Sequence, residues 1–355
     1  MLSTKRITSI DALRAFALLG ILLVHTAQLY NFYQPTNNHG YFTMFDNTLR
    51  ETILYFFENK CRTIFSILFG TSFYLILRNP NNNTKRFCWR CFILMGFGFI
   101  NQLFFTTDIL MCYGFTGILL ALLPFRRRST LQLLVIAAML YCVQFFEFLK
   151  LDTLVFPQAD YSLRYSSNQT VCQYLSYPIA SILKDSIHTF FPSITTNLSF
   201  FIFGYAIGRS GYIEHIYELT KLNNLCIIII LTIILRIICK WADYPIVLRH
   251  LANLSTSFCY ALLFVRIHKH TQRFMSPFEY YGKLGLTNYS TQNIFCPLLI
   301  LSIGLPFQFP FYAILSASIV FYLLQVLFAM TWLRFHRYGP WEFLWRKITN
   351  LPNLS

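Results

Sequence analysis

Three residues that could carry out chemistry lie inside the first apolar segment of the chain, 10–30. They are Asp11, Arg14 and His25. In an α-helix, two residues eleven positions apart are separated by about three full turns, so Arg14 and His25 share one face. Ionisable side chains inside a membrane cost roughly 2.5–3.5 kcal/mol each, so this stripe is expected to face a protein interior or a water-filled cavity. A neutral histidine placed there could act as a general base, since the unperturbed pKa of imidazole is about 6.5.

The same stripe also has a structural explanation. Asp11 and Arg14 lie one turn apart and could form an ion pair at the membrane interface. The long Arg14 side chain would then extend toward the lipid headgroups. His25 lies too deep in the segment to do this. The sequence therefore leaves both roles open for Arg14 and favours function for His25.

The composition is that of a membrane protein with several spans. Of the 355 residues, 55% are hydrophobic and only 12% are charged, and the mean hydropathy is +0.49. A soluble domain rarely reaches these values, because its surface must be polar. The net charge of +15 comes from Lys and Arg in short loops between apolar runs, so we expect no nucleic-acid partner. The ten cysteines lie mostly within apolar runs, so we expect no disulfide framework and no metal site.

Ten apolar runs are long enough to cross about 30 Å of hydrocarbon. Basic loops between them alternate with loops poor in Lys and Arg, which places all basic loops on the side of the N-terminal Lys5 and Arg6. We therefore expect an all-α polytopic integral membrane bundle in a single domain, 1–355, with about ten transmembrane helices and both termini cytoplasmic. The expected spans are 10–30, 53–77, 87–105, 108–125, 130–149, 191–209, 224–241, 246–266, 285–304 and 309–333.

One connection between these runs is much longer than the others. It covers about 150–190, falls on the extracytoplasmic side, and carries charges of both signs. Connections of this length are usually functional or disordered. We expect a partly helical cap over an opening that faces outward.

Further polar residues interrupt other apolar runs, and each group has a structural alternative. The charges of the second run could mark a helix that starts in the membrane interface. Asp108 could stabilise a helix N-terminus. The paired amides of the ninth run could bond neighbouring helices. These residues are Glu58, Lys60 and Arg62, then Asn101 and Asp108, and finally Asn288 and Gln292.

Five blocks of sequence carry a resemblance to a known family. They occupy 6–22, 62–70, 108–110, 282–292 and 339–346. Together they resemble the YeiB-like family, domain of unknown function 418, over nearly the whole chain. That family is similar to a larger group of transmembrane acyltransferases, which includes acyltransferase family 3 and heparan-α-glucosaminide N-acetyltransferase.

The resemblance gives two candidates for a catalytic base. Arg14 and His25 resemble the Arg/Lys–x10–His signature of acyltransferase family 3, in which the histidine is the expected base. The YeiB-like pattern usually has asparagine at the position of His25 and often has histidine at that of Asn101. The heparan enzyme places its functional histidine after the first span, which makes His39 the second candidate.

The resemblance implies transfer of an acyl group, acetyl in the simplest case, from cytoplasmic acyl-CoA to a hydroxyl or amine of an extracytoplasmic glycan or lipid. The location would be a bacterial inner membrane, and the oligomeric state is left open. The competing hypothesis is a transporter or flippase, in which the same charges line a substrate path without covalent chemistry. Besides Arg14, His25 and His39, the residues expected to bind donor or acceptor are Asp11, Lys60, Arg62, Ser66, Asn101, Asp108, Asn288 and Gln292.

Overall fold

The computed structural model describes residues 7–33, 40–78, 84–105, 108–146, 179–212, 215–243, 245–303 and 309–350. This part of the chain forms helices and no strands, which confirms the predicted all-α class. Where it is described, each of the ten predicted apolar runs coincides with helix. The elements are α1 (Thr8–Tyr33), α2 (Gly40–Phe57), α3 (Lys60–Leu77), α4 (Thr84–Gln102), α5 (Leu110–Leu122), the 3-10 helix η1 (Pro124–Arg127), α6 (Thr130–Phe146), α9 (Ile179–Arg209), α10 (Ile216–Leu219), α11 (Leu222–Trp241), α12 (Ile246–Lys283), α13 (Gly285–Ile303), α15 (Phe311–Phe335) and α16 (Pro340–Thr349).

The lengths and apolar surfaces of these helices identify a membrane protein. Among the described residues, four segments are long and apolar enough to cross a membrane: Thr8–Tyr30, Met44–Leu77, Leu222–Trp241 and Phe311–Phe335. Much of the outer surface of α11 consists of exposed isoleucine and leucine side chains, which suits contact with lipid. The total of about ten spans stays a prediction.

The second predicted span is not one continuous helix. α2 ends at Phe57, and α3 begins at Lys60 after a turn of two residues. Asn59 in this turn has a left-handed backbone with φ 62°, which asparagine tolerates better than most residues. The charges at 58–62 therefore mark a break between two helices, at which Asn59 is exposed and Lys60 is buried.

Two other helices extend beyond their predicted bounds. α9 begins at Ile179, so the end of the predicted 150–190 connection is helical; 147–178 lies outside the described residues. α12 runs 38 residues to Lys283 and contains a kink at Thr271, where the backbone is non-helical. The apolar run 246–266 marks only the first part of this helix, because polarity cannot show where a helix ends after it leaves an apolar environment.

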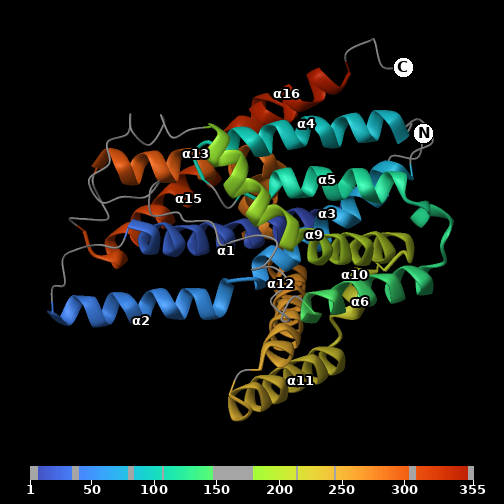
Figure 1. The fold of residues 1–355 in the computed structure, drawn as a ribbon, viewed down its shortest axis with the longest axis horizontal. Helices are drawn as coiled ribbons and strands as arrows, with labels where there is room; N and C mark the ends of the chain where they lie inside the picture. The colour runs from blue at the N-terminus through green and yellow to red at the C-terminus, as the bar shows by residue number, and fades with distance from the viewer. Residues whose placement is uncertain are drawn as a thin grey trace.

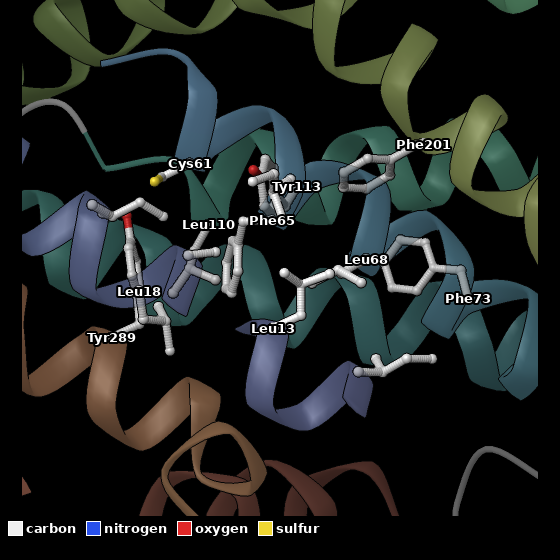
Figure 2. Close-up of a cluster of buried hydrophobic side chains, with 14 of the residues drawn as sticks. Leu13, Leu18, Cys61, Phe65, Leu68, Phe73, Leu110, Tyr113, Phe201 and Tyr289 are labelled. Atoms are coloured by element: carbon white, nitrogen blue, oxygen red, sulfur yellow. The ribbon is translucent and has the colours of Figure 1, made fainter. Parts of the chain in front are cut away.

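α1 lies in the middle of the bundle and contacts α2, α3, α12, α13 and α15 (Figure 1). Pairs α3–α9, α4–α5 and α6–α9 pack along their lengths, and α16 lies beside α4. α11 and the adjoining half of α12 project from the bundle (Figure 1). Figure 2 shows the core where α1, α3, α5, α9 and α13 meet, with side chains that include Leu13, Leu18, Phe65, Leu68, Leu110, Tyr113, Phe201 and Tyr289.

The crossing of α3 and α9 depends on two glycines. A Cβ atom on Gly70 would lie 2.2 Å from the carbonyl oxygen of Phe201, and one on Gly204 would lie 2.1 Å from that of Ile67. The Thr71 hydroxyl donates a hydrogen bond of 3.1 Å to the carbonyl oxygen of Gly204. Small residues allow helix backbones to approach this closely in membranes.

Replacing Gly204 by alanine is therefore expected to push α3 and α9 apart and to lower the free energy of unfolding by about 1–3 kcal/mol, the usual effect of overpacking. Gly96→Ala in α4 is the matched control, since a Cβ atom there meets no heavy atom within 4 Å. The control is expected to be neutral or stabilising, because alanine favours a helix over glycine by about 1 kcal/mol. Thermal unfolding of both variants in the same detergent makes the comparison, and equal midpoints would contradict the close crossing.

Candidate active site

His25, which is partly buried, is the first member of a chain of polar side chains whose other members are buried. Its Nδ1 atom lies 3.1 Å from Oδ1 of Asn293 on α13. Nδ2 of Asn293 in turn donates a hydrogen bond of 2.7 Å to Oδ2 of Asp108, just before α5. The amide of Asn101, at the end of α4, donates to the same carboxylate oxygen at 3.1 Å. Three parts of the chain that are distant in the sequence, α1, the α4–α5 connection and α13, therefore converge on this chain of contacts.

The hydrogen bonds define the tautomer of His25. Oδ1 of Asp108 accepts a bond of 2.8 Å from the backbone amide of Leu110, while Oδ2 accepts from the two asparagines. Since Asn293 donates to Asp108, its carbonyl oxygen faces His25 and can only accept. Nδ1 of His25 therefore carries the proton, which leaves a lone pair on Nε2. A histidine oriented in this way has the form of a general base.

A polar cavity of about 150 Å³ lies against the His25 ring. Within the described residues, no hydrogen-bond partner is found for Nε2 of His25. The ring is held from another side by Phe105, whose ring centroid lies 4.3 Å away. The cavity lining comes from α1, the α2–α3 break and the start of α5, and consists of Ile21, Val24, His25, Gln28, Phe57, Glu58, Asn59, Cys61, Arg62 and Ile109.

The break between α2 and α3 supplies the charged part of this lining. Glu58 and Arg62 both line the cavity, and in the part of the chain that the structure describes they form no ion pair with each other. Asn59, which lies between them in the sequence and has a left-handed backbone, also lines the cavity. Broken helices of this kind bring backbone polar groups and helix ends to binding sites at membrane depth. Of the charges that interrupt the second apolar run, Glu58 and Arg62 thus line the same cavity as His25.

Arg14 lies in a different environment from His25, although both are on α1. Its guanidinium donates 2.7 Å to Oδ1 of Asp11 and 2.6 Å to the hydroxyl of Ser72 on α3. Asp11 is only 2% exposed, so the carboxylate of this ion pair is enclosed by protein. Arg14 lines a second cavity, and the predicted continuous stripe from Arg14 to His25 is divided between two cavities.

Several other predicted site residues lie away from both cavities. Lys60 is buried, and its ammonium group donates 2.5 Å to the carbonyl oxygen of Tyr55. Ser66 donates to the carbonyl oxygen of Arg62 at 2.9 Å, and its oxygen lies 2.5 Å from the hydroxyl oxygen of Tyr113. Lys60 and Ser66 therefore support the helix break and its neighbours. His39, the second candidate base, lies outside the described residues.

Asn288 and Gln292 belong to a buried network that joins α12, α13 and α15. The Asn288 amide donates 2.9 Å to the carbonyl oxygen of Tyr281, and the Gln292 amide donates 2.7 Å to the hydroxyl of the same tyrosine. Gln325 on α15 completes the network, because its oxygen accepts from both Tyr281 and Gln292. This arrangement matches the structural alternative for paired amides, which bond helices within a membrane.

The residue that connects the site, Asn293, is not among those that the sequence singles out. It follows Tyr289 by one helical turn, within a run of polar side chains in which several positions look equivalent. Asn59, which lines the polar cavity, is likewise absent from the expected site residues. The signal that could have indicated Asn293 is its shared face with Tyr289, which contacts both Asp108 and His25.

Comparison with known proteins finds similar chains and a matching family model. An uncharacterized 39.9 kDa protein of Bacillus acidopullulyticus is 27% identical to this chain over 97% of this chain and 94% of its own length. The uncharacterized protein YxaH of Bacillus subtilis is 27% identical over 99% of this chain and 96% of its own length. The uncharacterized protein YeiB of Escherichia coli is 25% identical over 97% of this chain and 96% of its own length. Residues 207–352 match the family model described as protein of unknown function, DUF418.

The predicted resemblance to YeiB is confirmed, and it extends over nearly the whole chain. The DUF418 match covers α10 to α16 and includes Asn293, whereas His25 and Asp108 lie outside the matched residues. The candidate active site therefore joins the part of the chain that matches DUF418 to the N-terminal helices.

Proposed function

We propose that this protein is a membrane-bound acyltransferase. It moves an acyl group, acetyl in the simplest case, from cytoplasmic acyl-CoA to a hydroxyl or amine of an extracytoplasmic glycan or lipid. The observation that carries the proposal is the chain His25–Asn293–Asp108, which leaves Nε2 of His25 unprotonated beside a polar cavity.

The reaction uses the lone pair on Nε2. His25 removes the proton from the acceptor hydroxyl or amine as the acceptor attacks the thioester carbonyl carbon. A new bond forms to the acceptor, and negative charge develops on the carbonyl oxygen. The tetrahedral intermediate then expels the CoA thiolate, which takes the proton from His25, so the products are acylated acceptor and free CoA.

Arg62 is positioned to stabilise the intermediate. It lines the same cavity as His25, and a positive charge there favours the developing oxyanion. Gln28 and Asn59 contribute further polar side chains to the lining. Asn288 and Gln292, which were expected to bind donor or acceptor, lie in a separate network and leave this role to Arg62.

The proposed location is the plasma membrane of a bacterium, with several spans and both termini in the cytoplasm. Three bacterial relatives of similar length support a bacterial source. The alternation of basic and non-basic loops supports the cytoplasmic termini. This orientation places Arg14 nearer the cytoplasm than His25, so the donor and acceptor would approach from opposite sides.

The test is incubation of purified, lipid-reconstituted protein with radiolabelled acetyl-CoA. We expect the label to leave CoA, either to an acceptor that copurifies with the membrane or to water. A protein without acyltransfer chemistry would leave the thioester intact. Transport of an intact solute with no loss of thioester would contradict the proposal and support the transporter hypothesis.

A further inference from the structure

The second cavity, which contains Arg14, carries an excess of positive charge. Its volume is about 240 Å³, and it lies where the ends of α12 and α13 meet α3, α4 and α16. Four basic side chains line it: Arg14, Arg90, Lys283 and Arg346. The only carboxylate in the described lining is that of Glu342.

These charges are not neutralised equally. Arg14 is paired with Asp11 at 2.7 Å. Within the described residues, Arg90, Lys283 and Arg346 form no ion pair with a carboxylate. Arg90 and Arg346 lie close enough for their positive charges to repel. Like charges gathered around a partly enclosed space raise the local concentration of anions.

The single carboxylate is occupied elsewhere. Oε1 of Glu342 accepts hydrogen bonds of 2.8 and 3.1 Å from the backbone amides of Leu286 and Thr287, in the first turn of α13. The Thr287 hydroxyl donates to Oε2 of the same residue. Burial raises the pKa of the Glu342 carboxyl above its ordinary value, while these hydrogen bonds oppose the shift. Glu342 therefore caps the N-terminus of α13. The positive charges of Arg90, Lys283 and Arg346 are then available to bind an anion from outside the protein.

Aromatic side chains form the rest of the wall. Phe87 and Trp345 lie beside the basic residues, and the Trp345 indole donates 2.9 Å to the carbonyl oxygen of Arg90, which joins α16 to α4. Arg346 lies over the ring of Tyr338 at 4.1 Å from its centroid. Arginine recognises phosphate with two parallel hydrogen bonds, so two arginines and a lysine suit more than one phosphate group.

Tyr289 connects this cavity to His25. Its ring lines the basic cavity, its centroid lies 6.3 Å from that of the His25 ring, and its hydroxyl accepts 3.3 Å from the amide of Ile109. Leu110 lines the basic cavity, whereas Ile109 lines the polar one. The two cavities are therefore separated by Tyr289 and by consecutive residues at the start of α5.

We infer that the basic cavity binds the phosphate groups of a ligand that carries two or more of them, through Arg90, Lys283 and Arg346. The rest of that ligand lies against the apolar wall of the cavity, where Tyr289 approaches His25. The ligand's role as acyl donor rests on the proposed function, whereas its recognition through phosphate does not. Lys60 and Arg62, which were expected to bind donor or acceptor, do not line this basic cavity.

Binding to purified, lipid-reconstituted protein tests the inference, with coenzyme A, inorganic pyrophosphate and pantetheine as probes. We expect coenzyme A and pyrophosphate to bind more weakly as salt increases, and pantetheine, which lacks phosphate, to bind at least about 10-fold more weakly than coenzyme A. Arg90→Gln combined with Arg346→Gln is expected to weaken coenzyme A binding about 10-fold or more and to leave pantetheine unchanged. Arg127→Gln is the control, since Arg127 is exposed and outside the cavity lining.

Lys283→Gln is measured as a further variant of the site. An unfolding curve for each protein shows whether weaker binding results from a lost contact or from a protein that does not fold. Unchanged coenzyme A affinity in folded Arg90, Lys283 and Arg346 variants would overturn the inference, as would no binding of coenzyme A or pyrophosphate to the wild-type protein. Phosphate-dependent binding without any loss of thioester would instead contradict only the proposed acyl transfer. His25→Gln is expected to bind coenzyme A like the wild-type protein.

Discussion

Replacing His25 by glutamine is expected to lower the rate of acyl transfer by about 10²- to 10⁴-fold, the range that a general base supplies. The glutamine amide can still donate to Oδ1 of Asn293, so the polar chain to Asp108 keeps its partner. What is lost is the lone pair that accepts the acceptor's proton. The measurement is the rate of label loss from radiolabelled acetyl-CoA at saturating donor.

His270→Gln is the matched control for this variant. His270 is exposed on α12 and lines neither cavity. The control is expected to keep the wild-type rate, and both variants are expected to unfold at similar temperatures. A His25→Gln rate equal to that of His270→Gln would show that His25 is not the base.

The second large effect is expected for Asp108→Asn, although Asp108 does not line the cavity. Oδ1 of Asp108 accepts from the Leu110 amide and Oδ2 accepts from Asn293 and Asn101. An asparagine that keeps the bond to Leu110 turns an NH₂ group toward Asn293, and two donors then face each other. Asn293 relieves this by rotating its amide, which turns its own NH₂ group toward Nδ1 of His25.

The consequence is a change of tautomer at His25. Nδ1 must now accept, so the proton moves to Nε2, where it blocks the base. A comparable change of tautomer in a serine protease triad lowers the rate about 10⁴-fold, and we expect a fall of about 10²- to 10⁴-fold here. The same acetyl-CoA measurement applies, with kcat falling much more than the affinity for the donor changes.

A double variant provides the internal control for this argument. When Asn293→Asp is added to Asp108→Asn, the carboxylate introduced on α13 can accept from both the amide introduced at position 108 and the His25 ring, which restores the proton to Nδ1. We expect the double variant to recover a large part of the activity lost in Asp108→Asn. Failure to recover in a folded protein would assign Asp108 a purely structural role.

The sequence predicted the helical class and the helix that carries the candidate base. Long apolar runs identify helices reliably in a membrane protein, because lipid allows few alternatives for the backbone. Asp11, Arg14 and His25 stand out for the same reason, since a charge is unfavourable in such a run. The stripe was expected to face a protein interior or a cavity, and the structure places the contacts of all three residues there.

The division of that stripe between two cavities could not be predicted. It depends on which helices cover each turn of α1, and α3 and α13 arrive from distant parts of the chain. The charges at 58–62 left a helix start open as one alternative, and α3 does begin at Lys60, but the left-handed backbone of Asn59 has no distinct signal in the sequence. Arg90 lies near the start of one apolar run and Arg346 in the basic tail, and only the packing of α16 on α4 brings them together.

The central claim is that acyl transfer depends on His25, and comparison of His25→Gln with His39→Gln tests it most directly. Both variants are reconstituted in the same lipid, and loss of label from acetyl-CoA is measured beside the wild-type protein. The account predicts that His39→Gln transfers the acyl group at close to the wild-type rate while His25→Gln is nearly inactive. Wild-type activity in His25→Gln together with an inactive His39→Gln would contradict it.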